Sequence, residues 1–378
     1  MQKSLDRILT THTGSLIRPP ALQRDPRNET GVPPDVLRKE VEEIVRRQVG
    51  IGLDAVNDGE LGKSGWSGYI LKRIGGFEIR RDRPAPLVWL GRDRERFAEA
   101  VVQDLPFAAE GLPSEVCTGP IEYREGTGLE RDIEHLRSAA ASARAREVFM
   151  TAIAPASAAF NGVNEYYATE REYVFALADA LRREYRAIHD AGFVLQVDDA
   201  VLANMYDHLM QGGAKRYRDW AELRIEALNH ALDGIPPESV RYHVCFGSWH
   251  VPHVSDAPLE DIIDLVLQVN AGAYSIEAAN VRHEHEWRVW QRRRLPDGKT
   301  LVPGVVTHHT GTVEHPRLVA DRICRFAQLV GRENVIAGTD CGFAQVETIA
   351  RVHPSVMWAK LEALVEGARI ASLELFGR

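Results

Sequence analysis

The sequence is poor in the features that mark secreted, membrane and nucleic-acid-binding proteins. Its 378 residues include only four cysteines, at positions 117, 245, 324 and 341. No apolar run reaches the roughly 18 residues of a membrane span, and the first residues, MQKSLDRILTTHTG, lack the apolar core of a secretory signal. Basic residues are not in excess, since the formal net charge is -8. These absences predict a cytoplasmic protein with reduced thiols and no membrane or nucleic-acid partner.

The composition is that of an ordinary globular protein, and short apolar runs recur regularly along the chain. Hydrophobic residues make up 44% of the chain and charged residues 26%, which supports a large buried core. Eight short apolar runs, typical of strands, alternate with long amphipathic segments, typical of helices. The predicted strands are 8–14, 53–58, 148–154, 193–198, 239–245, 273–278, 301–307 and 334–339, and the predicted helices are 34–50, 170–190, 217–233, 258–269, 314–330 and 354–374.

Eight strands that alternate with helices favour an α/β fold of the (β/α)₈ TIM-barrel type, formed as a single catalytic domain by residues 1–378. An open, doubly wound sheet is the alternative. It is disfavoured because no GxGxxG follows an early strand, although GIGLDAVNDGELGKSG contains glycines. Residues 71–125 break the rhythm with short strand-like pieces, prolines and glycines. We interpret them as a β-hairpin-bearing insertion after the second strand, with one helix at about 93–103.

Seven of the eight predicted strands end in reactive or charged side chains. In a barrel of this type the chemistry gathers at the carboxyl ends of the strands, so we expect these side chains to share one face. The strand ends carry His12 to Ser15, Asp58 to Glu60, Asp198 and Asp199, His243 and Cys245, Glu277, His308 and His309, and Asp340 and Cys341.

Four of these residues have the chemistry of a zinc site: His243, Cys245, Glu277 and Cys341. Thiolate, imidazole and carboxylate groups are the usual ligands of zinc, and thiolates select it over magnesium or calcium. His243 and Cys245 are two residues apart, so in a strand they face the same side. The alternative is that the cysteines pack as small core residues. A zinc site here could activate a substrate thiol, and this makes a thiol alkyltransferase the leading hypothesis.

These motifs resemble those of the cobalamin-independent methionine synthase family, specifically its C-terminal catalytic barrel. The similarity spans nearly the whole chain through TTHTGSLIRP, GLDAVNDGE, LQVDDAVL, HVC, SIEAAN, PGVVTHHTGTVEHP and GTDCGF, in the family's order. The resemblance implies a zinc-dependent barrel, a short single-barrel member, that methylates a thiol such as homocysteine. It also implies that His243, Cys245, Glu277 and Cys341 bind zinc, that Ser15, Glu60 and Asp198 hold the amino-acid end of the thiol, and that His309 assists transfer as a proton donor.

Part of this assignment also follows from the residues themselves. Glu60 and Asp198 offer two carboxylates to an ammonium group such as that of homocysteine. The alternative is that carboxylates at these turns cap the following helices, for which Asp58, Asp199 and Ser15 are also suitable. His309 could equally be a loop histidine or support a metal ligand. His308 could take its role, and His12 could line the site or lie in the core.

Some residues depart from the family pattern. The family's D-x-H-S-P is THHTG here, so Thr307 replaces its aspartate, and D-E-P is Asp198-Asp199-Ala200. The full-length synthase's additional N-terminal half is missing. These changes leave the alkyl donor open between a folate and a corrinoid on a carrier protein.

A zinc-dependent thiol–epoxide transferase or lyase, of the coenzyme M type, is the second hypothesis. An anionic thiol of that type needs a basic residue in the pocket, for which Arg18 is the candidate. A metal-free decarboxylase-like barrel and a non-catalytic binding barrel are weaker alternatives, because neither explains the cysteines and reactive strand ends.

Two further features remain open in the sequence. RHEHEW at 282–287 could form a second metal cluster, although such a run is more often a polar loop with ion pairs. Aromatic residues near the predicted strand ends could form a wall for a planar donor or could be ordinary packing. They are Trp66, Tyr69, Trp249 and Trp287.

Overall fold

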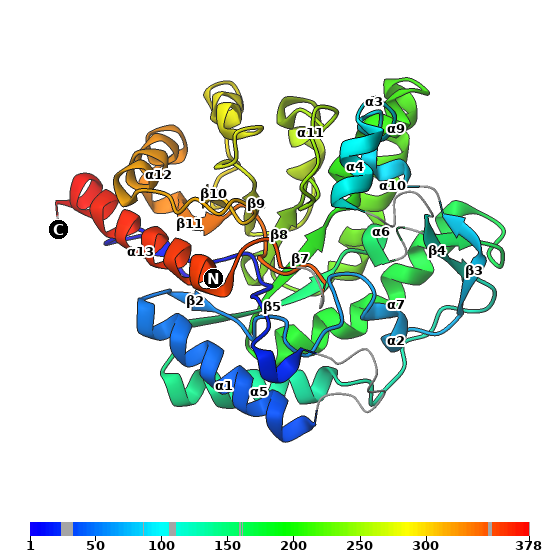
Figure 1. Ribbon diagram of the computed structural model, residues 1–378, viewed down its shortest axis with the longest axis horizontal. Helices are drawn as coiled ribbons and strands as arrows, with labels where there is room; N and C mark the ends of the chain where they lie inside the picture. Colours follow the sequence, from blue (N-terminus) through cyan, green and yellow to red (C-terminus); the bar gives the residue numbers. More distant parts are fainter. Residues whose placement is uncertain are drawn as a thin grey trace.

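The architecture is a parallel β-barrel surrounded by helices, as the sequence predicts (Figure 1). The computed structural model describes residues 1–23, 33–85, 87–105, 111–158, 160, 162–346 and 350–377. Eight parallel strands form one sheet in the order β1-β11-β10-β9-β8-β7-β5-β2. They are β1 (Leu9–Thr10), β2 (Ala55–Val56), β5 (Glu147–Ile153), β7 (Val194–Asp199), β8 (Val240–Val244), β9 (Ala273–Ile276), β10 (Thr300–Val306) and β11 (Ile336–Thr339).

Hydrogen bonds next to the two end strands bring the sheet to near closure. The Asp54 N–H, just before β2, donates to the Thr10 carbonyl of β1 at 3.1 Å. Further along, the Leu16 N–H donates to the Gly59 carbonyl at 3.0 Å. Each of the eight predicted strands overlaps one strand of this sheet, so the prediction of a (β/α)₈ barrel is confirmed.

Helices surround the barrel and bury their apolar faces against it. All six predicted helices are present, and α5 is an additional one. Their starts follow local chemistry: α1, α12 and α13 begin at prolines, and Thr169 and Glu172 form a capping box at the start of α7. No helix in the described ranges has the length and apolar character to cross a membrane. The helices are α1 (Pro34–Ile51), α5 (Leu129–Ala143), α7 (Glu170–Asp190), α10 (Ala214–Leu232), α11 (Leu259–Val266), α12 (Pro316–Val330) and α13 (Pro354–Phe376).

The predicted hairpin lies between β2 and β5, at one edge of the molecule (Figure 1). β3 (Phe77–Ala85) and β4 (Leu112–Cys117) pair antiparallel, and β6 (Gly162–Asn164), which comes after β5, extends this sheet parallel to β4. That third strand is absent from the sequence prediction because its three residues carry no periodic signal. The single expected helix is two short ones, α3 (Asp93–Arg96) and α4 (Ala98–Asp104). The extent of the catalytic domain, 1–378, stays a prediction.

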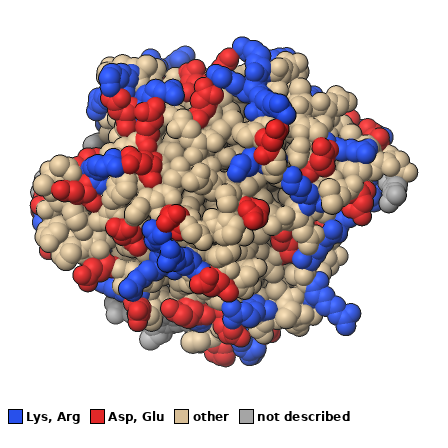
Figure 2. All heavy atoms as spheres, turned by 180° about the vertical axis from the view of Figure 1, so that it is seen from behind, with Lys and Arg blue, Asp and Glu red and all other residues tan. Residues whose placement is uncertain are grey.

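Surface charge is mixed on the face that Figure 2 shows. Acidic and basic side chains lie interspersed over this face, and the area near its centre is mostly uncharged. No large area of basic side chains is visible on this face.

Candidate active site

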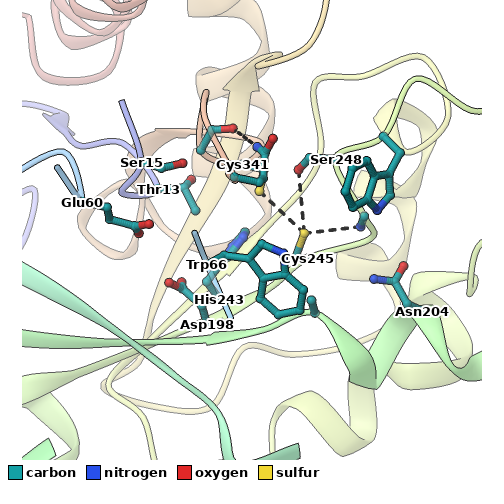
Figure 3. A pocket seen from close by; sticks show the side chains of 15 residues that line it. Thr13, Ser15, Glu60, Trp66, Asp198, Asn204, His243, Cys245, Ser248 and Cys341 are labelled. Atoms are coloured by element: carbon teal, nitrogen blue, oxygen red, sulfur yellow. Dashed lines mark hydrogen bonds between the residues drawn. The ribbon is translucent and has the colours of Figure 1, made fainter. Parts of the chain in front are cut away.

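A pocket opens at the carboxyl ends of the barrel strands, with about 560 Å³ of empty space that includes the part open to solvent. Six of the eight residues predicted for metal, substrate or catalysis line it (Figure 3). In the figure, Ser15 and Glu60 lie on one side, the cysteines lie towards the middle, and Asp198 lies with His243 below Trp66. The six residues are Ser15, Glu60, Asp198, His243, Cys245 and Cys341.

Three of the predicted metal ligands lie close enough to share one ion. The donor atoms of His243, Cys245 and Cys341 are all within 4.8 Å of one another, and the two sulfur atoms are 3.6 Å apart. His243 is 2% exposed, yet neither ring nitrogen has a hydrogen-bond partner. A buried polar atom without a partner is costly, and such an atom is expected in a residue whose partner is a metal ion. The donor set therefore fits a soft divalent cation such as zinc.

Cys341 is fixed by its neighbour Asp340. The fully buried Asp340 carboxylate accepts hydrogen bonds from the N–H groups of Ala278 and Ala279, both at 2.8 Å, and so ties the end of β11 to the loop after β9. Gly304 on β10 must be small, because a Cβ there would lie 2.0 Å from an Asp340 oxygen. The hydrogen bond with Cys245 and burial raise the pKa of the Cys341 thiol well above its ordinary value. Without a cation this thiol stays protonated at neutral pH.

The fourth predicted ligand, Glu277, is buried beside this group but is not within it. One of its oxygens accepts from the N–H of Phe246, the residue after Cys245, at 3.2 Å, and the other accepts from the Asn280 side chain at 2.8 Å. Burial, with the charges of Asp340 and Cys341, raises the pKa of Glu277 well above its ordinary value. The structure thus brings three ligands together and holds the carboxylate of the fourth in hydrogen bonds.

The predicted substrate residues also line the pocket, and Asp198 stands directly beside His243 on the neighbouring strand. Glu60 has a φ of 59°, a left-handed conformation that is unfavourable for a side chain longer than glycine and is concentrated at functional sites. Its Oε1 accepts from the Thr151 hydroxyl at 2.8 Å. The Asp198 carboxylate accepts from the Gln196 amide at 2.6 Å, and burial raises its pKa to about 7. Ser15 Oγ accepts from the Ala344 N–H at 3.2 Å.

The acids next to Glu60 and Asp198 stabilise turns and helix starts, which is the alternative role that the sequence left open for carboxylates here. Asp58 accepts from the Glu60 N–H at 2.9 Å and so stabilises the turn itself. Asp199 accepts from the N–H groups of Val201 and Leu202, at the start of the short helix α8 (Val201–Asn204). Glu60 and Asp198 are therefore the two acids that face the pocket.

The predicted assisting histidine, His309, lies in the loop after β10 and is not among the residues that line the pocket. Its Nδ1 has no partner, its carbonyl accepts from His250 Nε2 at 2.9 Å, and burial lowers its pKa to about 4. His308 is more deeply buried, and burial lowers its pKa well below the ordinary value. His12 lies in the core, where Nε2 bonds to the Gln48 amide at 2.8 Å.

A buried ion pair fixes the histidine loop where the family's aspartate is missing. Lys360 on α13 donates to the Glu314 carboxylate at 2.9 Å and to the Thr312 carbonyl at 2.5 Å. The other Glu314 oxygen accepts from the Thr307 N–H at 2.8 Å. The loop therefore keeps a fixed start although Thr307 cannot act as an acid.

The remaining open features of the sequence are resolved by their contacts. The RHEHEW segment is an ion-pair cluster, since His283 bonds to Glu286 at 2.8 Å and to Asp256 at 3.1 Å. Trp66 and Trp249 line the pocket, whereas Tyr69 and Trp287 do not. Arg18 does not line it either, because it donates to the backbone carbonyls of Glu60 and Lys63.

Sequence patterns missed a layer of polar residues beneath the site. Gln196, Arg241, Ser275 and Thr339 each stand two residues before a predicted site residue, and the alternation of a strand turns them to the same side. That spacing could have identified them. Lys63 and Thr151, which also lie beneath Glu60, have no such signal, because the chain places them far from each other in sequence.

A (β/α)₈ barrel with thiol and imidazole groups at the carboxyl ends of its strands is typical of enzymes whose active site can bind a metal ion. Comparison with known proteins identifies the family within this class of enzymes. A family model described as "Cobalamin-independent synthase, Catalytic domain" matches residues 160–361. The chain belongs to this family, and the resemblance seen in the sequence motifs is confirmed.

Individual relatives are distant but similar over most of their length. The methionine synthase of Thermococcus kodakarensis is 24% identical over 336 residues, which cover 88% of this chain and 82% of that protein. The 2-hydroxypropyl-CoM lyase of Xanthobacter autotrophicus is 23% identical over 91% of this chain and 88% of its own. Among solved structures, a B12-independent methionine synthase from Shewanella sp. W3-18-1, in complex with selenomethionine, has a TM-score of 0.73 at 18% identity and covers 98% of this chain and 100% of its own. This last similarity supports the fold.

Proposed function

We propose that this protein is a zinc-dependent methyltransferase that moves a methyl group to the thiol of homocysteine. The observation that carries the proposal is one pocket that joins a buried, unpartnered histidine and two thiols with two carboxylates, of which Asp198 stands beside His243 on the neighbouring strand. The histidine and thiols suit a metal that binds sulfur, and the carboxylates suit the ammonium group of an amino acid. The methionine synthases among the relatives support the same substrate.

Zinc would be held by His243, Cys245 and Cys341, with Glu277 as the fourth ligand in this proposal. When bound, zinc supplies a Lewis acid that lowers the pKa of a substrate thiol and so makes it a nucleophile at neutral pH. The chain's own contribution is the rigid attachment of these ligands. Asp340 fixes the strand end that carries Cys341, and Asn280 bridges the carboxylates of Asp340 and Glu277.

In the same pocket, Glu60 and Asp198 receive the substrate ammonium group and Ser15 offers a hydroxyl to its carboxylate. Among the described residues that line the pocket there is no lysine or arginine. This charge balance favours an amino-acid thiol over a thiol with a sulfonate group. It therefore ranks the thiol–epoxide reaction of the coenzyme M type second, although one relative carries out a reaction on a coenzyme M derivative.

In the transfer itself, the sulfur attacks the methyl carbon of the donor and the bond from that carbon to the leaving atom breaks. The leaving nitrogen of a folate then takes up a proton, whereas the cobalt of a corrinoid keeps the electron pair and needs none. His309 is the proton donor to a folate in this proposal and, because burial lowers its pKa to about 4, it takes up a proton only when the donor binds. Trp66 and Trp249 offer a flat apolar wall to the donor. Both a methylated folate and a methylcorrinoid on a carrier protein suit this reaction, since each releases its methyl group to a thiolate.

The test is an assay of zinc-loaded protein with homocysteine and, in parallel reactions, methyltetrahydrofolate or methylcobalamin. The expected product is methionine, detected by mass spectrometry, from at least one donor and not from protein treated with a chelator. A parallel reaction with coenzyme M and epoxypropane tests the alternative. Product from that reaction alone would assign the thiol–epoxide activity and reject the proposed methyl transfer.

A further inference from the structure

Lys63 is a buried ammonium group immediately beneath the substrate side of the pocket. Its side chain is 6% exposed, and Nζ donates to the Thr151 hydroxyl at 2.6 Å and to the Thr151 carbonyl at 2.7 Å. Nζ also lies 4.5 Å from the centre of the Tyr69 ring. A buried charge is retained only where such partners compensate for the loss of water. No motif in the sequence accounts for this lysine.

The Thr151 hydroxyl connects Lys63 to Glu60 through a second hydrogen bond. A hydroxyl has one proton to donate, and because ammonium can only donate and carboxylate can only accept, the direction of the chain is fixed. Lys63 donates to Thr151, and Thr151 donates to Glu60 Oε1 at 2.8 Å. Thr151 is 1% exposed, so water does not compete for its hydroxyl.

The surroundings leave Glu60 little freedom to turn away from this contact. Its own backbone is left-handed, with a φ of 59°. Gly14 faces the carboxylate, and a Cβ at position 14 would lie 2.7 Å from Glu60 Oε1 and 2.8 Å from the Thr151 methyl group. The other carboxylate oxygen, Oε2, has no hydrogen bond from any residue that the structure describes, and the Glu60 side chain points into the pocket in Figure 3.

Charge on this side of the pocket is also set by the lysine. Lys63 places a positive charge beneath the carboxylate of Glu60, and so offsets part of the negative charge that the carboxylates of Glu60 and Asp198 give this side of the pocket. Because the Lys63 ammonium is directed at Thr151, beneath Glu60, it orients the carboxylate without lining the pocket itself.

We propose that Lys63 and Thr151 are positioning residues that hold Glu60 with its free oxygen towards the α-ammonium group of the substrate thiol, and so make the enzyme select thiols with a free amino group. This inference rests on the proposed function, since it concerns the same thiol. It adds two residues that never touch the substrate and a mechanism by which the pocket distinguishes an amino-acid thiol from its deaminated analogue.

The test compares the binding of homocysteine and of 4-sulfanylbutanoate, the same thiol without the amino group, to the zinc-loaded protein by isothermal titration calorimetry. Thr151→Val removes the hydroxyl with little change in volume, Thr151→Ser retains it, and Lys63→Met removes the ammonium. Lys72→Met is the matched control, because Lys72 is exposed on α2 (Ile70–Arg73). Zinc content is measured for every variant.

The wild-type protein should prefer homocysteine by about 10-fold or more, the effect expected for a hydrogen bond to a charged group. Thr151→Val and Lys63→Met should lose most of that preference with unchanged zinc content and unchanged affinity for 4-sulfanylbutanoate. Thr151→Ser and Lys72→Met should keep it. A purely structural role of Thr151 would weaken both thiols equally, and that result would overturn the inference.

The remaining outcomes separate this inference from the proposed function. Equal affinity of the wild-type protein for the two thiols overturns the selection by amino group but leaves a thiol-binding enzyme in place. If neither thiol binds to the zinc-loaded wild-type protein, both the inference and the proposed function are wrong.

Discussion

Two histidine clusters at the same end of the barrel differ in how their polar atoms are satisfied. In the active-site cluster, His243 stands beside Cys245 and Cys341 and neither of its ring nitrogens has a partner. In the ion-pair cluster, His283 bonds through one nitrogen to Glu286 and through the other to Asp256. Both histidines are buried.

The difference identifies the functional cluster. Leaving a buried donor or acceptor unsatisfied is destabilising, so a native protein retains such atoms where a ligand completes them. The ion-pair cluster is complete within the chain and has no need of a ligand. Residue type alone does not reveal this, since RHEHEW contains as many potential ligands as the His-x-Cys motif and its partners.

The largest expected effect is on the active-site cluster itself. Cys341→Ser replaces a thiol ligand by a weakly binding hydroxyl, so zinc content should fall and turnover should drop by about 100-fold or more. Metal analysis and the methionine assay measure the two quantities on the same sample. Cys324→Ser on α12 is the control, because Cys324 lies outside the pocket and should change neither. A metal-free Cys341→Ser protein with full activity would refute the proposed role of zinc.

The next largest effect separates binding from proton transfer. His309→Gln removes the proposed proton donor without touching a ligand, so turnover should fall by about 100-fold while zinc content stays at the wild-type level. The exposed His285 in the ion-pair segment is the matched control, and His285→Gln should retain full turnover. If His309→Gln is fully active and His308→Gln is not, the role belongs to His308.

A change in the ion-pair cluster should lower the stability of the protein and leave its turnover and zinc content nearly unchanged. His283→Gln breaks a buried ion-pair network and should lower the free energy of unfolding by about 3 kcal/mol, while turnover and zinc content stay within about twofold of wild type. Chemical denaturation and metal analysis measure these effects. Loss of zinc at a constant free energy of unfolding would show that His283 also contributes to the metal site.

The smallest expected effect is a pH dependence of stability. Although burial lowers the pKa of His283, its hydrogen bonds to Asp256 and Glu286 prevail and raise it to about 10. A folded-state pKa above the unfolded value of about 6.5 means that its stabilisation is complete below pH 6.5 and is lost as the pH rises through 10. The free energy of unfolding of the wild type should therefore fall towards that of His283→Gln between pH 7 and 10. A constant difference across this range would contradict the raised pKa.

The sequence predicts the fold well because the barrel repeats a local pattern. All eight strands and six helices follow from periodicity and from proline or capping residues. The position of three predicted ligands in the pocket follows too, because His243 and Cys245 are two residues apart at the end of β8 and Cys341 follows the end of β11. The predicted cytoplasmic location stays a prediction, and the sequence leaves the alkyl donor open.

Sequence patterns could not predict the contacts between segments that lie far apart in the chain. The Lys63, Thr151 and Glu60 chain joins the loop after β2 to β5, and the Lys360 and Glu314 pair joins α13 to the histidine loop. Each depends on which side chains the closed barrel brings together, and no local spacing encodes that. The hydrogen-bonded position of Glu277 is of the same kind.

X-ray absorption spectroscopy of the zinc-loaded protein can show directly whether the two thiols and the histidine bind the metal. We expect one zinc per chain with two sulfur neighbours at about 2.3 Å and at least one nitrogen neighbour at about 2.0 Å. A spectrum with only oxygen and nitrogen neighbours, or a protein that retains no zinc, would contradict the assignment of His243, Cys245 and Cys341 as the metal site.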